Sequence, residues 1–221
     1  MSRLKEICEY ELNKNMLEGL EEIDIKKTLK ENPVILSVLI GNYAHRNQLR
    51  VNGENYFNHP VSCLNIFLDM LNTNKENMYD IDFKLLFKLN LPFIGIYELC
   101  LLHDVIEDTD FTMSDLKDIF YECELYDLFD ENIKEELTLL THNKSEEYDI
   151  YLDRILTNKP ASLVKMLDMM SNSRVYTLDK FGEKEYERGL YYYNSIYKIN
   201  NKYHFVETFN TYRNNRKERA N

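Results

Sequence analysis

The sequence predicts an all-α fold, and three observations support that class. Glycine and proline are rare, with 6 and 4 among 221 residues. Apolar residues recur at the spacing of one helix face along most of the chain. The glycines and prolines that do occur fall between these periodic stretches, where they would separate one helix from the next. A strand-rich fold would require many more turns, so we expect a bundle of several helices.

Local signals set the expected helix boundaries along the chain. Thr112 and Ser114 precede Asp115 in the pattern of a helix start. Pro160 occupies a first-turn position before an apolar run. Together with the periodicity, these signals predict helices over residues 2–20, 24–31, 33–49, 60–73, 82–89, 94–107, 112–121, 130–141, 145–157, 160–177 and 183–201.

The chain is long enough to bury one substantial core. With 221 residues and 44% hydrophobic content, it fits a single main domain, which we place over residues 33–205. Residues 1–32 are expected to form an N-terminal helical extension. Residues 206–221 are expected to form a polar, basic, exposed tail.

The charge balance argues against a nucleic-acid-binding protein. The formal net charge is −11, whereas binding through phosphate contacts requires a clustered Lys/Arg surface. An acidic protein can still bind phosphorylated small molecules where a dication and a few arginines reverse the local field. We therefore expect a small-molecule partner and no nucleic acid, while the sequence carries no signature of oligomeric state.

The cysteines and the N-terminus indicate a reducing, aqueous compartment. Cys8, Cys63, Cys100 and Cys123 are scattered without CxxC spacing, which favours reduced and mostly buried thiols over disulfides. Residues 1–20 are charged throughout, and no signal peptide or membrane span is readable. We expect a cytoplasmic protein that does not engage a membrane.

The stretch 101–109 carries the strongest functional signal. It places His103 and Asp104 at the end of an apolar run and Glu107 and Asp108 one helical turn later. Positions i and i+4 share a helix face, so these four polar groups are expected to line one wall. Such a wall could hold a metal ion and a water molecule.

Two further residues complete a plausible set of metal ligands. His59 precedes Pro60 just ahead of an expected helix, and Asp168 lies in the apolar stripe of another, where a charge is costly unless it is paired or bound to a metal. Together with His103 and Asp104 they offer two imidazoles and two carboxylates, a set suited to Mn, Fe, Co, Ni or Zn. The alternative is that Asp104 and Asp168 are buried partners of Lys or Arg.

The order and spacing of these residues resemble the HD-domain metal-dependent phosphohydrolases over roughly residues 33–177. The closest type is the hydrolase domain of RelA/SpoT-like proteins and the small alarmone hydrolases. The motifs that carry the resemblance are Gln48-x-Arg50, Tyr56, His59-Pro60, His103-Asp104 with Glu107-Asp108, and Lys165-x-x-Asp168 with Asn172.

The resemblance implies a multi-helix HD-type bundle with a metal site between helices. One divalent metal, usually manganese, would be held by His59, His103, Asp104 and Asp168. Glu107 and Asp108 resemble the pair that orients and deprotonates the attacking water, Arg50 the arginine against the nucleotide base, and Asn172 the asparagine that reaches the nucleoside. The reaction of that family removes the 3′-pyrophosphate from guanosine tetra- or pentaphosphate.

Two positions depart from the pattern of that family. Many relatives carry a basic residue where this chain has Val51 and Met169, so two positive charges that could meet phosphate are missing. Compensating charges are expected from among His45, Arg46, Lys144, Arg154, Lys165 and Arg174.

Three alternatives to an alarmone hydrolase remain open at this stage. The first is an HD-type enzyme acting on another nucleotide or phosphate ester, because a fold does not fix a substrate. The second is a low-turnover module that senses nucleotides, and the third is a helical scaffold without a metal. The acidic pair Glu107 and Asp108 favours an enzyme, since a binding module has no evident use for it.

Overall fold

Regular structure in the described part of the chain is helical. The computed structural model describes residues 2–12, 22–71, 81–173 and 182–220. Across these ranges the only β structure is an isolated antiparallel bridge between Leu49 and Asn55, and turns and loops join the helices. The predicted all-α class is therefore confirmed. Among the helices in these ranges, none has the length and apolar character that a membrane span requires.

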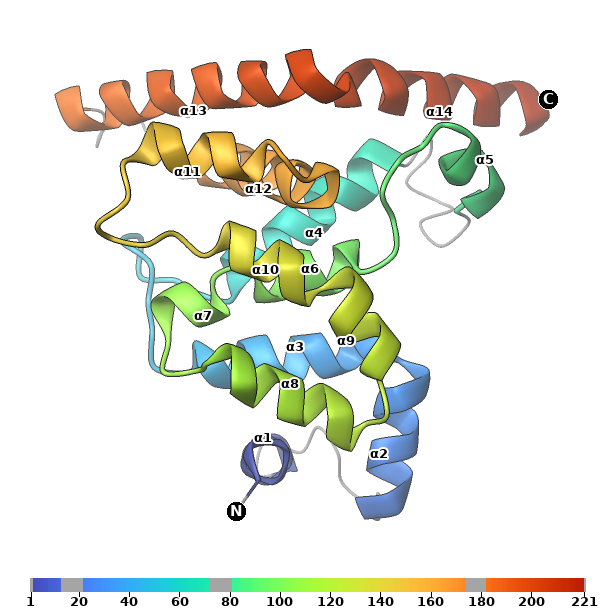
Figure 1. Ribbon diagram of the computed structural model, residues 1–221, viewed down its shortest axis with the longest axis vertical. Helices are drawn as coiled ribbons and strands as arrows, with labels where there is room; N and C mark the ends of the chain where they lie inside the picture. The colour runs from blue at the N-terminus through green and yellow to red at the C-terminus, as the bar shows by residue number, and fades with distance from the viewer. Residues whose placement is uncertain (1, 13–21, 72–80, 174–181, 221) are drawn as a thin grey trace.

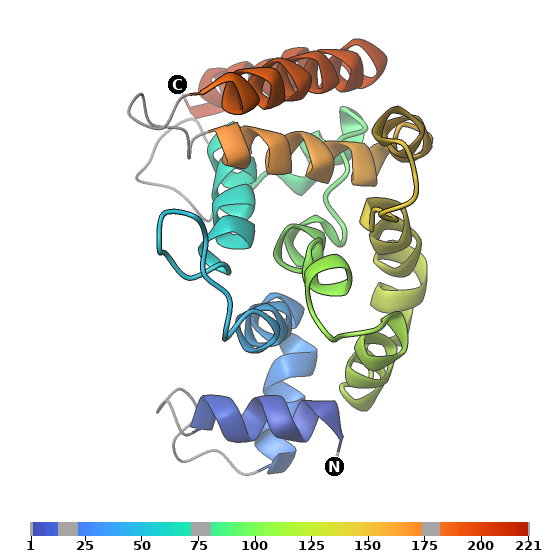
Figure 2. The same cartoon turned by 90° about the vertical axis from the view of Figure 1, so that its left-hand side faces the viewer.

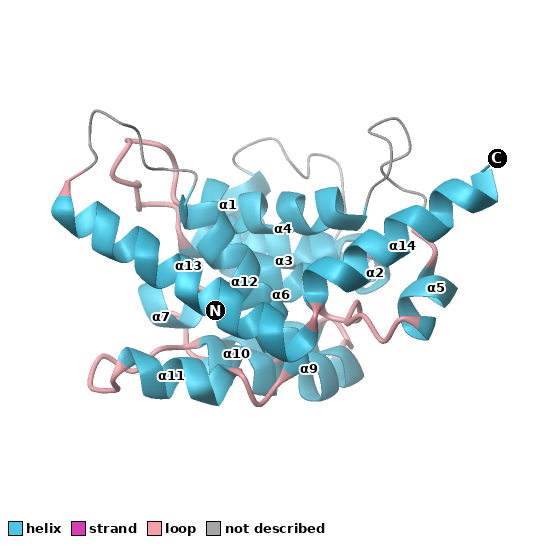
Figure 3. Cartoon of the chain, turned by 90° about the horizontal axis from the view of Figure 1, so that it is seen from above, coloured by secondary structure: helices cyan, strands magenta, loops and turns pink. Residues whose placement is uncertain are grey.

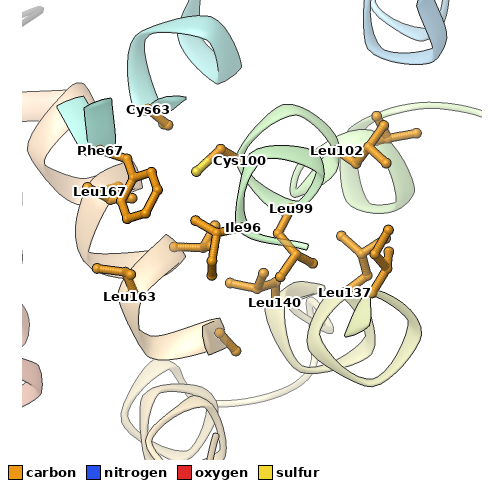
Figure 4. Packing of buried hydrophobic residues seen from close by; sticks show 14 of the residues in the cluster. Cys63, Phe67, Ile96, Leu99, Cys100, Leu102, Leu137, Leu140, Leu163 and Leu167 are labelled. Atoms are coloured by element: carbon orange, nitrogen blue, oxygen red, sulfur yellow. The ribbon is translucent and has the colours of Figure 1, made fainter. Parts of the chain in front are cut away.

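Four helices form the centre of the bundle (Figure 1). They are α3 (Pro33–Ala44), α4 (Asn58–Leu71), α6 (Ile96–Leu102) and α12 (Lys159–Ser173). Each contributes fully buried apolar side chains to one continuous core. Figure 4 shows this packing around Phe67, Leu99 and Leu167. Burial of this apolar surface is the main force that holds the three site-bearing helices, α4, α6 and α12, together.

The remaining helices surround this centre. At one end, α1 (Arg3–Leu12) and α2 (Glu22–Glu31) pack on α3, and α8 (Met113–Glu122) packs on α1 (Figure 2). At the other end, α13 (Glu183–Tyr203) packs on α12 and α14 (Phe205–Ala220) on α4 (Figure 3). The shorter elements are α5 (Phe83–Lys88), α7 (Val105–Asp108), α9 (Tyr126–Asn132), α10 (Lys134–Leu140) and α11 (Tyr148–Ile155).

The signals for helix starts act in the structure as the sequence predicts. The Thr112 hydroxyl accepts a hydrogen bond from the backbone N–H of Asp115 at 3.2 Å. The Asp115 carboxylate in turn accepts from the backbone N–H of Thr112 at 2.8 Å, which completes a capping box. Pro160 lies in the first turn of α12. The expected ends of the helices over 2–20, 60–73 and 160–177 lie outside the described residues.

Two helices that the periodicity predicts as continuous are broken in the structure. The one expected over 94–107 divides into α6 and α7, with His103 and Asp104 in the turn between them. Here the carbonyl of Cys100 accepts a hydrogen bond from the His103 ring. The one expected over 130–141 divides into α9 and α10 at Ile133, whose backbone lies outside the helical region while its side chain is fully buried.

The C-terminal residues form a helix rather than an exposed tail. In α14, Phe205, Phe209 and Tyr212 follow the spacing of one helix face and are buried. The Tyr212 hydroxyl accepts a hydrogen bond from the backbone N–H of Asp82 at 2.9 Å. In the sequence, polar residues separate these three aromatic residues, so their apolar stripe is not evident from composition. The expectation of an exposed tail is therefore wrong for residues 206–215. The division into domains at residues 32 and 205 stays a prediction.

A close approach between α3 and the segment before α4 makes Gly41 sensitive to substitution. A Cβ atom at Gly41 would lie 2.2 Å from the Phe57 ring and 3.0 Å from the Leu101 carbonyl oxygen. We expect Gly41→Ala to lower the free energy of unfolding by about 1–3 kcal/mol, because the core cannot take the extra methyl group without a shift. Urea denaturation measures the change.

Gly189→Ala in α13 is the matched control, since no atom of the described residues lies within 4 Å of its added Cβ. It should stabilise the protein by up to about 1 kcal/mol through helix propensity alone. Equal effects of the two substitutions would contradict the packing seen around Gly41.

Candidate metal centre

Three helices bring the predicted ligand residues to one point. His59 comes from the first turn of α4, His103 and Asp104 from the turn after α6, and Asp168 from the middle of α12. His59 Nε2 lies 3.0 Å from Asp168 Oδ1 and 3.5 Å from Asp104 Oδ2. His103 Nε2 lies 3.2 Å from Asp104 Oδ1 and 3.7 Å from Asp168 Oδ1. Residues more than 100 positions apart thus converge on a single buried cluster.

Each imidazole is oriented by a hydrogen bond at its other nitrogen. His103 Nδ1 donates to the Cys100 carbonyl at 2.9 Å, which leaves the Nε2 lone pair directed at the carboxylates when the ring is neutral. His59 Nδ1 lies 2.9 Å from the Ser171 hydroxyl, which holds that ring in the same way. This is the arrangement by which proteins orient histidines that bind metals.

The polar groups of the cluster fit a cation that is shared between them. The His103 side chain is 3% exposed, and its Nε2 has no hydrogen-bond partner in the part of the chain that the structure describes. The Tyr56 hydroxyl carries one proton, yet it lies 3.0 Å from Asp104 Oδ2 and 2.6 Å from Asp108 Oδ2. One proton cannot be donated fully to both carboxylates, so these two groups have room for a further proton donor or a cation. Two imidazoles and two carboxylates are a suitable donor set for a divalent metal.

The electrostatics of the cluster also favour binding of a cation. Burial by itself would lower the pKa of His103, but the Asp104 and Asp168 carboxylates beside it raise that pKa to about 9. Burial and the same acidic surroundings raise the pKa of the Tyr56 phenol, so its hydroxyl stays protonated. The carboxylates therefore attract a proton or a cation into this part of the core.

Asp168 also forms an ion pair, so the ion-pair alternative holds in part. Its Oδ2 lies 2.8 Å from Lys165 Nζ, while its Oδ1 faces the histidines. Burial would raise the pKa of the Asp168 carboxyl, but Lys165 and the two histidines hold it well below its usual range. The pKa of Lys165 lies well above its ordinary value, mainly because of Asp168. Asp104 instead faces the two histidines.

Cys63 belongs to the cluster and was missed by the sequence analysis. One ligand atom from each of His59, Cys63, His103 and Asp168 lies within 4.8 Å of the others, and all four residues are buried. Cys63 follows His59 by one helical turn on α4, so the two side chains share a face. That i, i+4 spacing was a usable signal, but a lone cysteine without a second one nearby favours a structural thiol.

The acidic pair lies beside the cluster on α7. Asp108 shares the Tyr56 hydroxyl with Asp104, as the predicted i, i+4 relation requires. The Glu107 carboxylate accepts a hydrogen bond from the backbone N–H of His142 at 2.9 Å. Partial burial raises the pKa of Glu107 above its ordinary value, which makes it a better proton acceptor at neutral pH.

Arg50 and Asn172 meet at the edge of the cluster. A turn with Gly53 at φ 83° follows Arg50, and the Gly53 N–H donates to the Arg50 carbonyl at 2.8 Å. Arg50 Nη2 donates to Asn172 Oδ1 at 2.7 Å, and Asn172 Nδ2 donates to Asp168 Oδ1 at 2.7 Å. The two residues expected to contact a substrate are thereby connected to an expected metal ligand.

The two positions that depart from the motif pattern noted in the sequence, Val51 and Met169, differ in their surroundings. Val51 is 93% exposed and follows Arg50 at the edge of the site. Met169 is 0% exposed and belongs to the hydrophobic core. An added positive charge at residue 51 would face solvent beside the site, whereas residue 169 cannot present one in this packing.

Among the expected compensating residues, Lys165 lies closest to the ligands. Arg154 instead forms an ion pair with Glu146 at 2.8 Å and donates to carbonyls at the end of α10. Arg46 lies 4.0 Å from the centroid of the Tyr43 ring, and His45 is buried against Gln48. Lys144 is exposed, and Arg174 lies outside the described residues.

Comparison with known proteins supports the fold. No family model matches the sequence, and no curated protein matches it. Among solved structures, the chain is similar to one described as a metazoan ortholog of SpoT that hydrolyses ppGpp and plays a role in starvation responses. The identity is 17%, the TM-score is 0.51, and the match covers 80% of this chain and 93% of the other. The predicted resemblance to the RelA/SpoT-type hydrolase domain is thus confirmed for the fold.

The difference in burial between residues 51 and 169 can be tested by measuring the stability of lysine variants at each position. We expect Met169→Lys to lower the free energy of unfolding by about 3 kcal/mol or more, because it buries an unpaired charge. Val51→Lys should change it by less than about 0.5 kcal/mol, since the side chain is exposed. Urea denaturation of both variants measures the difference. A Met169→Lys protein as stable as wild type would contradict the burial of this position.

Proposed function

We propose that this protein is a metal-dependent nucleotide phosphohydrolase. The leading substrate is guanosine 3′,5′-bispyrophosphate (ppGpp), from which the enzyme would remove the 3′-pyrophosphate to give GDP and pyrophosphate. The observation that carries the proposal is the buried cluster of two histidines and two aspartates with an acidic pair beside it. The similar solved structure of a ppGpp-hydrolysing SpoT ortholog makes this substrate the first to test.

One divalent metal would be held by His59, His103, Asp104 and Asp168, with Mn²⁺ as the expected ion. When bound, such an ion supplies Lewis acidity to a phosphoryl oxygen and to the attacking water. The positive charge that the carboxylates attract would then come from the metal.

The acidic pair would handle the proton of the attacking water. Glu107 is the stronger candidate for the proton acceptor, because its pKa is raised and its carboxylate is held by the His142 N–H. Asp108 and the Tyr56 hydroxyl would orient the water, since both lie beside Asp104. Accepting this proton commonly contributes about 10² to 10⁴ to a hydrolysis rate.

The substrate would be bound by the residues at the rim of the cluster. Arg50 offers a guanidinium and Asn172 an amide at the point where they meet. Arg50 would lie against the nucleotide base and Asn172 would reach the nucleoside. Lys165 supplies a buried positive charge beside Asp168 that could face an incoming phosphate. The substrate-binding region therefore has positively charged side chains, although residues 51 and 169 carry no charge.

A product assay tests the proposal. Manganese-loaded protein is incubated with ppGpp, ordinary nucleotides and 3′-phosphorylated nucleotides, and the products are separated. Pyrophosphate and GDP from ppGpp are expected. Release of orthophosphate from another ester, with ppGpp left intact, would contradict ppGpp hydrolysis and indicate an enzyme that acts on another phosphate ester. Saturable nucleotide binding without turnover would favour a sensing module, and protein that retains no metal would favour a scaffold.

Glu107→Gln separates the proton acceptor from the metal ligands. We expect kcat to fall by about 10²- to 10⁴-fold, because the amide cannot accept the proton from water. Metal content, measured by elemental analysis, should stay at the wild-type level. Glu131→Gln on α9 is the control, since Glu131 is an exposed glutamate on a helix outside the cluster. A Glu107→Gln enzyme with wild-type kcat would remove Glu107 from the mechanism.

Asp104→Ala tests the ligand set itself. Loss of this carboxylate should remove both bound manganese and hydrolysis, because it faces both histidines. Asp118→Ala on α8, an exposed aspartate outside the cluster, should keep both. Undiminished manganese content and activity in Asp104→Ala would overturn the assignment.

A further inference from the structure

Cys63 occupies a position that the proposed hydrolysis does not use. Its side chain is fully buried on the core side of the cluster, where it packs in the same core as Phe67, Cys100 and Leu167 (Figure 4). Asp104 is not one of the four residues grouped with Cys63; it contacts the Tyr56 hydroxyl, and its side chain is 18% exposed. The two histidines thus have a fully buried sulfur donor and a partly exposed oxygen donor beside them.

Three residues could act together with either donor. His59, His103 and Asp168 group with Cys63 within 4.8 Å, and the same two histidines face Asp104. Among the described residues, Nε2 of the buried His103 has no hydrogen-bond partner, and it belongs to this group. Ser171 Oγ lies 2.9 Å from His59 Nδ1 and orients that ring.

We propose that the cluster has two alternative ligand sets, an oxygen set completed by Asp104 and a sulfur set completed by Cys63 that binds thiophilic dications such as Zn²⁺. Two imidazoles, a thiolate and a carboxylate form a four-donor set of the kind that Zn²⁺ prefers. Mn²⁺ prefers oxygen and nitrogen donors and would use Asp104 instead. On binding, a bond forms between Sγ and the metal, and the thiol proton is released to solvent.

The sulfur set has a consequence that rests on the proposed function. A metal bound through Cys63 would use the sulfur donor in place of Asp104, the carboxylate that shares the Tyr56 hydroxyl with Asp108. Zinc should therefore occupy the cluster tightly and support little hydrolysis. Cys63 would thereby make the manganese enzyme sensitive to inhibition by zinc.

Cobalt provides a direct spectroscopic probe of the sulfur ligand. Protein titrated with Co²⁺ should develop a near-ultraviolet charge-transfer band from thiolate to metal. Cys63→Ser should lack this band, because a hydroxyl cannot supply it. Cys123→Ser is the matched control: it also replaces a buried thiol, but beside α1 and α2, and it should keep the band. A band that persists in Cys63→Ser would overturn the proposal.

Metal affinities provide a second readout. Competition with a chelator should show that Cys63→Ser binds Zn²⁺ about tenfold or more weakly than wild type, since loss of even an outer-shell contact commonly costs about 10- to 100-fold in metal affinity. Mn²⁺ binding, followed by electron paramagnetic resonance, should stay at the wild-type level, because the oxygen set does not include Cys63. Cys63→Val, which keeps an apolar side chain in the core, should give the same result and guards against a folding defect in the serine variant. Unchanged Zn²⁺ affinity in both folded variants would contradict the sulfur set.

These results separate the two proposals. A cobalt band together with absence of ppGpp hydrolysis would keep the sulfur set and remove the proposed substrate. Hydrolysis without a band, and with equal Zn²⁺ affinity in the variants, would keep the enzyme and remove the sulfur set. Zinc inhibition of the manganese enzyme should weaken in Cys63→Ser and persist in Cys123→Ser.

Discussion

The buried carboxylate of Asp168 is the interaction on which the rest of the site depends. A charge in the middle of α12 is costly unless several partners compensate it. Lys165 neutralises one oxygen, while His59 and Asn172 bind the other. These contacts connect α12 to α4 and, through Asn172, to Arg50. The hydrophobic core positions the three helices, and Asp168 gives their meeting point its chemistry.

The sequence could predict the main features of the fold because its helical periodicity is strong and breakers are few. It could not predict the break at His103, since a ring hydrogen bond to the Cys100 carbonyl is invisible in a periodic pattern. It also missed α14, whose three buried aromatic residues are spaced by polar ones. Both errors arise where tertiary contacts outweigh local signals.

The proximity of the candidate ligands was predictable from the sequence, whereas their environment was less so. Residue types and spacing singled out His59 and Asp168, and His59 Nε2 lies 3.0 Å from Asp168 Oδ1 in the structure. The place of Cys63 beside them depends on the approach of α4 to α6 and α12, which a single sequence does not reveal. The difference between residues 51 and 169 likewise becomes visible only when their burial is known. Residue 169 lies in the core and could not present a charge to a substrate, so residue 51 is the one position where a basic side chain is missing beside the site. Lys165 provides a positive charge from the same helix as Asp168.

We infer that two histidines and two aspartates share one divalent cation. Crystals of the manganese-loaded protein, measured at a wavelength where manganese scatters anomalously, would locate that cation. We expect one anomalous peak at bonding distance from Nε2 of His59 and His103 and from the carboxylates of Asp104 and Asp168. An empty cluster in which these residues keep only their mutual hydrogen bonds, with manganese bound elsewhere or absent, would contradict it.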